Sequence, residues 1–160
     1  MADEEGGFTS MGSHSSFPRA RALVLDNSER EASALSAALA EVGFLTDVAS
    51  RPNTANALLQ VAEQEGAPYE VLIVAEMVTG ICGLDLAAAL ALRVRTRPTT
   101  FLSSGPFSAR EAGELTRSRC SGVILKPLRL DQFHATLAAA LSADRLRAIR
   151  EGKAAGLLAL

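Results

Sequence analysis

The chain has 160 residues, of which 48% are hydrophobic, and this is enough material for about one globular domain. Its 16 basic residues against 18 acidic ones leave a net charge of −2, so no basic excess indicates binding to nucleic acid. No apolar run approaches the roughly 20 residues that span a bilayer. The acidic first residues are not typical of a secretory signal, and the two cysteines, Cys82 and Cys120, are typical of free thiols. We expect a single-domain cytoplasmic protein without nucleic-acid or membrane partners.

Short apolar segments alternate with segments of helical periodicity from about residue 19 onward. Residues 1–18 are rich in Gly and Ser and are expected to form a disordered tail. Residues 22–25 predict a buried strand, and Ser28 or Asn27 is expected to cap a helix that ends at Gly43. Further strands are predicted at 44–49, 69–75, 99–103 and 122–125, and further helices at 53–64, 83–94, 109–117 and from Asp131 to as far as Arg150.

This order of elements predicts an α/β fold. Five strands that alternate with five helices are best satisfied by a (βα)5 doubly wound five-stranded parallel sheet with helices on both faces. The domain is expected to span residues 19–142. Residues 143–160 are expected to extend the last helix or to form a tail, because the apolar period continues through Leu146 and Ile149.

Side chains at the carboxyl ends of the predicted strands are the candidates for a functional site, because ligands of doubly wound sheets bind there. The turn after the first strand, Asp-Asn-Ser-Glu, has no glycine, which excludes a dinucleotide fingerprint and a P-loop. Neither a Gly-x-Ser-x-Gly elbow nor a set of metal-thiolate ligands is present. What remains is a carboxylate after the first strand, hydroxyls after the fourth, and Lys126 before a proline after the fifth.

Over about residues 20–142 the chain resembles the receiver domain of bacterial two-component response regulators. The resemblance rests on Leu-Val-Leu-Asp-Asn, on the loop that ends in Gly83-Leu84-Asp85-Leu86, on Leu-Ser-Ser-Gly and on Gly-Val-Ile-Leu-Lys-Pro. It implies a flavodoxin-like fold with a cis Lys126–Pro127 bond. It also implies a phosphorylated aspartate at the end of the third strand, two acids that hold Mg²⁺, a Ser/Thr and a lysine that contact the phosphoryl group, and an aromatic switch residue on the fifth strand.

The acidic half of that pattern is incomplete in this chain. Asp26 falls on the first acid, but Asn27 stands in the place of the second. The acceptor position, eight residues before Gly83, is Ala75, which has no nucleophile. Glu76 would occupy it if the loop were one residue shorter, and could then mimic a phosphorylated state by reaching Lys126; the alternative for Glu76 is a solvated loop acid.

The other half of the pattern is partly retained. Lys126 is in place, with a structural pairing to Asp26 as an alternative role. Counting from Pro98 favours Ser103 as the hydroxyl residue, whereas counting back from Lys126 favours Ser104. Val123 stands at the position of the aromatic switch. We therefore expect a pseudo-receiver without catalytic residues, with Asp26 as the only residual Mg²⁺ ligand and with weak or absent Mg²⁺ binding.

The resemblance implies a role in signal transduction. We expect a non-enzymatic domain that acts by protein–protein interaction without phosphorylation, with a histidine kinase, a response regulator or another signalling protein as partner, and as a homodimer. Two alternatives stay open: a phosphorelay receiver that uses Glu76 or another acceptor, and a flavodoxin-like domain that senses a small ligand. The expected partner face contains Arg110, Glu114, Arg117, Leu130 and Phe133.

Overall fold

A five-stranded parallel sheet forms the centre of the computed structural model, which describes residues 19–105 and 120–159. The strand order is β2-β1-β3-β6-β7, and every neighbouring pair is parallel. The predicted doubly wound α/β fold is confirmed. The strands are β1 (Arg21–Leu25), β2 (Leu45–Ala49), β3 (Val71–Ala75), β6 (Thr99–Ser104) and β7 (Gly122–Leu125).

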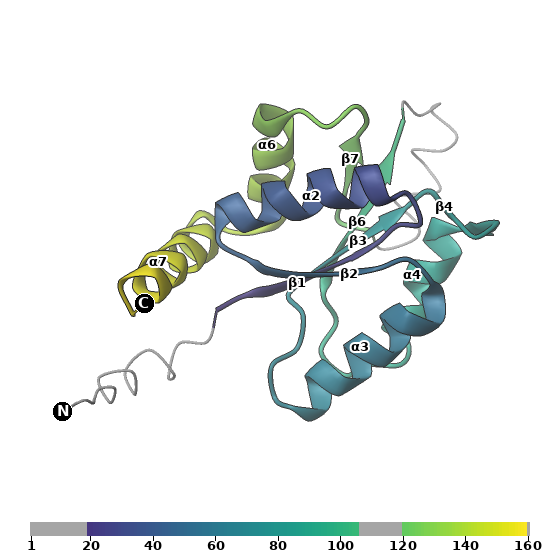
Figure 1. Cartoon of the computed structure of the whole chain (residues 1–160), viewed down its shortest axis with the longest axis horizontal. Coiled ribbons are helices and arrows are strands. Elements are labelled where there is room, and N and C mark those ends of the chain that lie inside the picture. The colour runs from purple at the N-terminus through teal and green to yellow at the C-terminus, as the bar shows by residue number, and fades with distance from the viewer. Residues whose placement is uncertain (1–18, 106–119, 160) are drawn as a thin grey trace.

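Helices cover both faces of this sheet (Figure 1). One core cluster joins the sheet to α2, α6 and α7, and a second cluster joins the other face to α3 and α4. The helix predicted at 109–117 and the tail at 1–18 lie outside the described residues. The described helices are α2 (Glu29–Val42), α3 (Pro52–Gln64), α4 (Gly83–Ala91), α6 (Leu130–Ala140) and α7 (Ala143–Ala159).

The central strands are buried on both sides, which is why their sequence is apolar without alternation. All five residues of β3 are buried, as are the last four of β1. Successive side chains point to opposite faces, so Val24 and Ile73 join the cluster under α2, whereas Leu23 and Leu72 join the cluster under α3. Both helical layers are therefore held by the same strands.

The segment between β3 and α4, predicted as a loop, contains a small hairpin. Strand β4 (Met77–Val78) pairs antiparallel with β5 (Ile81–Cys82). The turn residues Thr79 and Gly80 both have positive φ, 48° and 81°, which is the requirement of a type I′ turn. Two-residue strands leave no periodic signal, and threonine is not typical of a positive φ, so the sequence did not indicate the hairpin.

The last helix was predicted as one element and is two. Helix α6 ends at Ala140, and Leu141 is extended at φ −109° and ψ 139°. Ser142 then caps the N-terminus of α7, since its Oγ accepts a hydrogen bond from the backbone N–H of Arg145 at 3.1 Å. The apolar period continues on both sides of this break, and for that reason the sequence pattern did not reveal it.

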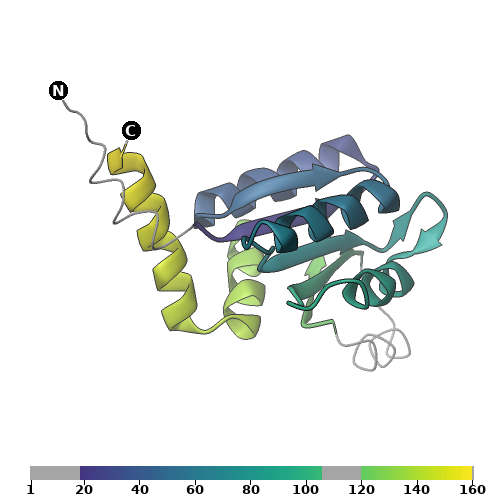
Figure 2. The same cartoon turned by 90° about the horizontal axis from the view of Figure 1, so that it is seen from below.

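Helix α7 turns back onto its own domain at the end of the sheet where β1 begins (Figure 2). Leu146 and Ile149 are buried in the cluster that contains Phe44. Arg145 pairs through its guanidinium with both carboxylate oxygens of Glu70, and Lys153 Nζ donates to the carbonyl oxygen of Glu41 at 3.0 Å. Arg145, Leu146, Ile149 and Lys153 thus hold α7 against the domain body.

Candidate functional site

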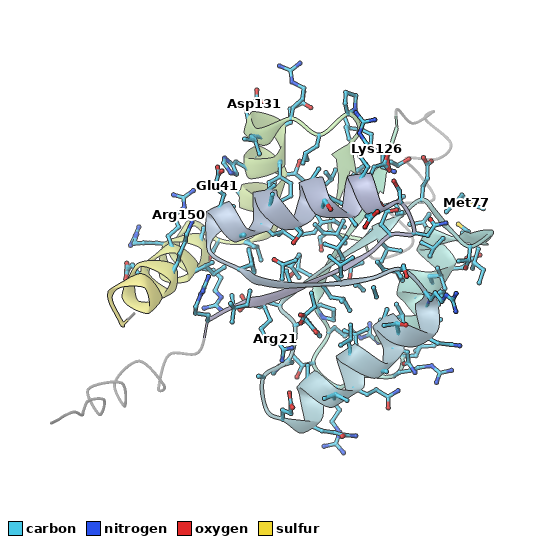
Figure 3. The ribbon with its side chains drawn as sticks, viewed as in Figure 1. Arg21, Glu41, Met77, Lys126, Asp131 and Arg150 are labelled. Atoms are coloured by element: carbon cyan, nitrogen blue, oxygen red, sulfur yellow. The ribbon has the colours of Figure 1, made fainter. Side chains whose placement is uncertain are left out.

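The predicted cluster of polar side chains forms at the carboxyl ends of the strands. Asp26 follows β1, Ala75 is the last residue of β3, Ser103 and Ser104 end β6, and Lys126 follows β7. In the sheet register, Ala75 lies level with Ser103. The sticks in Figure 3 place Lys126 beside the first turns of α2. The Lys126–Pro127 bond is cis, as the resemblance implied.

Asp26 is the buried acid of this cluster. Its exposed fraction is 3%, its Oδ1 accepts a hydrogen bond from the backbone N–H of Ser28 at 2.8 Å, and its buried Oδ2 has no hydrogen-bond partner in the structure. Burial raises the pKa of the Asp26 carboxyl, and the Ser28 hydrogen bond and the positive charge of Lys126 oppose this rise. Asn27 beside it is exposed.

Lys126 forms an ion pair with Glu31, at 2.5 Å between Nζ and Oε1. This corrects the alternative in which Lys126 pairs with Asp26. Ser28 caps α2, as one of the two predicted caps: its Oγ accepts a hydrogen bond from the backbone N–H of Glu31 at 3.4 Å. The Ser28 N–H donates to Asp26, and the Glu31 carboxylate reaches Lys126. Glu31 is the site residue whose role the sequence did not indicate.

Glu76 is held against β6 from two sides. Its backbone N–H donates to the carbonyl oxygen of Ser103 at 3.0 Å, and its Oε2 accepts a hydrogen bond from Ser104 Oγ at 2.8 Å. Glu76 is exposed, as expected for a solvated loop acid. Its carboxylate is nevertheless bound by the hydroxyl of Ser104, a residue that is 1% exposed. No Glu76–Lys126 pair exists, since the Lys126 ammonium pairs with Glu31.

The two candidate serines have different surroundings. Ser103, which is 2% exposed, lines a cavity of about 520 Å³ together with Lys126. Ser104 follows it in the strand, points to the opposite side and binds Glu76. The cavity lies between α2 and the β7–α6 turn, and its walls include Glu31, Leu35, Ile124 and Leu128.

The expected partner face is only partly described. Leu130 is 47% exposed and can contact a partner. Phe133 is 1% exposed and belongs to the core cluster with Ile124, so its placement on an interaction surface is corrected: the aromatic ring fills the space between α6 and the sheet. Val123 is half-buried. Arg110, Glu114 and Arg117 lie outside the described residues.

Comparison with solved structures gives the same architecture at low sequence identity. Chemotaxis protein CheY4 of Vibrio cholerae aligns with a TM-score of 0.65 and 19% identity over 78% of this chain and 100% of that chain. A two-component response regulator from Clostridium difficile aligns at 0.64 and 17% over 79% and 98%. The chain has the receiver fold. No family model and no curated protein sequence matches it.

A third structure with the receiver fold contains the modification itself. It is a response regulator from Burkholderia pseudomallei with a phosphorylated aspartic acid, a calcium ion and citrate, and it aligns with a TM-score of 0.61 and 23% identity over 81% of this chain and 71% of that chain.

Within residues 19–105 and 120–159, this chain shows no helix long and apolar enough to cross a membrane.

The divalent cation that the receiver fold implies does not fit the residues present. A hard cation needs several oxygen ligands, and here Asp26 supplies one buried carboxylate beside an exposed amide. In the part of the chain that the structure describes, no group of three or more His, Cys, Asp or Glu side chains could hold a metal ion.

Replacing Asp26 by asparagine is expected to raise the free energy of unfolding at neutral pH. The pKa of Asp26 is raised above 3.8 in the folded chain, so its ionised form costs stability above the raised pKa, and this cost disappears as the pH falls towards 3.8. The gain of Asp26→Asn should therefore shrink on acidification. Urea unfolding over a pH series measures this gain, with exposed Asp85→Asn as the control that should show none. A gain that grows at acid pH would contradict the burial of an ionised Asp26.

Proposed function

We propose that this chain is a signalling domain of the receiver fold that acts through protein contacts without aspartyl phosphorylation and without catalysing a reaction. One observation carries the proposal: at the carboxyl end of the sheet, a serine and the lysine are each bound to an acid of this chain, and the acceptor position is an alanine. Ser104 donates to Glu76, Lys126 pairs with Glu31, and the last position of β3 is Ala75.

The chemistry of these groups supports the proposal. The Ala75 side chain has no oxygen that could accept a phosphoryl group. The transfer also uses a divalent cation, which needs several oxygen ligands, and the only acid among the buried residues is Asp26. A phosphoryl group that paired with Lys126 would have to break its contact with Glu31, and one that bound Ser104 would have to break its contact with Glu76. A partner surface that needs no phosphorylation is therefore available at all times.

A signalling protein is the expected partner class: a histidine kinase, a response regulator or a second copy of this chain. Leu125 and Leu130 support a contact surface at β7 and the start of α6, since they are 42% and 47% exposed. Contiguous patches of exposed large apolar side chains are typical of protein-binding surfaces. The homodimer and the cytoplasmic location stay predictions.

A small-ligand sensor is the second candidate function. The cavity of about 520 Å³ beside Ser103 and Lys126 supports it, because that volume is in the range of small-molecule sites and its walls combine apolar side chains with a few polar groups. In this case Glu31 and Lys126 would select the ligand.

The test is the intact mass of the protein after incubation with acetyl phosphate and Mg²⁺, beside a receiver domain known to be phosphorylated. We expect no added phosphoryl mass on this chain, because Ala75 cannot accept the group. A single stoichiometric addition to the unmodified chain, on Glu76 or elsewhere, would overturn the proposal and return the protein to the class of phosphorylated receivers.

Two variants show whether the missing carboxylates are the cause. Ala75→Asp alone is expected to gain little or no phosphoryl mass, because Asn27 remains in the place of the second acid. The double variant Ala75→Asp/Asn27→Asp restores both carboxylates and should gain more mass than Ala75→Asp. Equal, full phosphorylation of Ala75→Asp alone would show that Asn27 does not limit the reaction.

A further inference from the structure

The cavity beside Lys126 contains a buried hydroxyl group that has no hydrogen-bond partner. Ser103 is 2% exposed and lines this cavity, whose volume is about 520 Å³. The Ser103 carbonyl accepts a hydrogen bond from the backbone N–H of Glu76, but the Ser103 Oγ makes none with the residues that the structure describes. A buried hydroxyl without a partner is costly and is normally satisfied by a ligand or by water.

The Ser103 side chain points into the cavity. Successive residues of a strand face opposite sides of the sheet, so Ser103 lies on the same side as Phe101, which packs in the core cluster under α2 and α6. Ser103 is level with Ile124 of β7, which belongs to that cluster and also lines the cavity. Within the described residues, the Ser103 Oγ is not one of the unbonded polar atoms that are closed to solvent. The hydroxyl therefore opens into the cavity.

Most of the remaining wall is apolar. Leu35 of α2 and Ile124 of β7 are buried and line the cavity from the helix and from the sheet. Leu128, in the turn between β7 and α6, packs against the same core cluster and lines a further side. A cavity of this size, with apolar walls and a few polar groups, is typical of a small-molecule site.

The charged groups of the lining leave no free charge for an ionic ligand inside the cavity. Lys126 Nζ lies 2.5 Å from Glu31 Oε1, so these two groups form an ion pair in the wall. Arg30, the third charged residue of the lining, is exposed to solvent. An anion beside Lys126 would also meet the Glu31 carboxylate, and a cation beside Glu31 would meet the Lys126 ammonium group. Because burying an uncompensated charge is costly, the wall favours an uncharged ligand.

We propose that this cavity binds an uncharged small molecule that carries a hydroxyl group on an apolar body. The ligand hydroxyl bonds to the Ser103 Oγ, which can both donate and accept, and the apolar body packs on Leu35, Ile124 and Leu128. This proposal rests on the second candidate function, the small-ligand sensor, and names the class of its ligand.

The experiment is a titration of the full chain with benzyl alcohol and, separately, with cyclohexanol, followed by amide chemical shifts in two-dimensional NMR. Both probes are uncharged and join one hydroxyl group to one apolar ring. Toluene, which lacks the hydroxyl, and benzoate and benzylamine, which are charged, are the comparison compounds.

Two pairs of variants test the residues of the cavity. Ser103→Ala removes the unbonded hydroxyl, and its control is Ser33→Ala, at an exposed serine of α2 that does not line the cavity. Ala34→Phe places a ring at the cavity, and its control is Ala37→Phe, one turn further along the same helix. Ala34 and Ala37 are both exposed, so both variants are expected to fold, but only Ala34 lines the cavity.

We expect at least one of the two alcohols to shift the amides around Ser103, Leu35 and Lys126 in a saturable way, and to bind more tightly than toluene, benzoate or benzylamine. The affinity should be about threefold or more weaker in Ser103→Ala, because one hydrogen bond is lost. It should be about tenfold or more weaker in Ala34→Phe, because the ring competes for the same space. Neither control variant should change it.

The absence of a saturable shift with both alcohols would overturn the proposal. Equal affinity for toluene, or equal affinity of Ser103→Ala and the original chain, would overturn it as well. These outcomes are distinct from a failure of the proposed signalling function, because that function is tested by the mass of the protein after incubation with acetyl phosphate, in which no alcohol takes part.

Discussion

Replacing Gly83 by alanine is expected to lower the free energy of unfolding by about 3 kcal/mol or more. Gly83 is the first residue of α4, and its N–H donates to the carbonyl oxygen of Glu76 at 2.8 Å. A Cβ at this position would lie 2.0 Å from the carbonyl oxygen of Ala75 and 2.9 Å from Leu102 Cδ1. The first neighbour is backbone and cannot rotate away, so β3 and α4 would have to separate.

Urea unfolding of Gly83→Ala measures this loss, with Gly152→Ala as the control. Gly152 lies in α7 with open space around its Cα, and alanine there should be neutral or stabilising by up to about 1 kcal/mol, because alanine favours helix. If Gly83→Ala were as stable as the original chain, the close contact between α4 and the end of β3 would be wrong. The hydrogen bond from Gly83 to Glu76 would then be in doubt as well.

Replacing Ile149 by alanine is expected to cost about 2 kcal/mol or more. Ile149 is 3% exposed, although it lies in the terminal helix α7, and its backbone carbonyl and Cγ2 lie close to Gly43. Two contributions make up this loss of stability. The free energy gained by burying the removed methylene and methyl groups is lost, and the cavity that they leave costs further free energy. Gly43, at φ 129°, has no Cβ, which permits this close approach of α7.

The matched control is Arg150→Ala, one residue further along the same helix and exposed (Figure 3). It should change the free energy of unfolding by less than about 0.5 kcal/mol. Sedimentation velocity over a concentration series separates two roles of α7. If Ile149 packs within its own domain, Ile149→Ala destabilises the chain at every concentration. An unchanged stability with a changed oligomeric state would show that Ile149 instead contacts another copy.

The contacts of Glu31 and Glu76 change what a mutation at this site can mean. Each acid binds a group that the receiver resemblance offers as a contact of the phosphoryl group: Glu31 binds Lys126, and Glu76 binds Ser104, one of the two candidate serines. Substitution of either acid would free that group without supplying an acceptor. Loss of either acid alone is therefore not expected to make the chain a phosphorylated receiver, because Ala75 remains at the end of β3.

The architecture and the strand-end residues could be predicted from the sequence, because both depend on local patterns. Apolar runs such as 71–75 mark strands buried on both faces, and parallel strands bring their carboxyl ends to one edge. Asp26, Ser103 and Lys126 were therefore expected to lie together. Ser103 and Lys126 line one cavity, and the charge of Lys126 acts on Asp26. The spacing from Gly83 to Ala75 has a physical basis in the contact between these two residues.

Pairings between side chains that are distant in the sequence were decided only by the tertiary structure. Lys126 pairs with Glu31, and Ser104 pairs with Glu76. Which partner each side chain meets depends on the distances from α2 to β7 and from β3 to β6, and these distances are set by packing. Likewise, a continuous apolar period contains no signal for the break at Leu141, which turns α7 back onto the sheet and buries Ile149. Periodicity reports which side of an element is apolar, but not what that side meets.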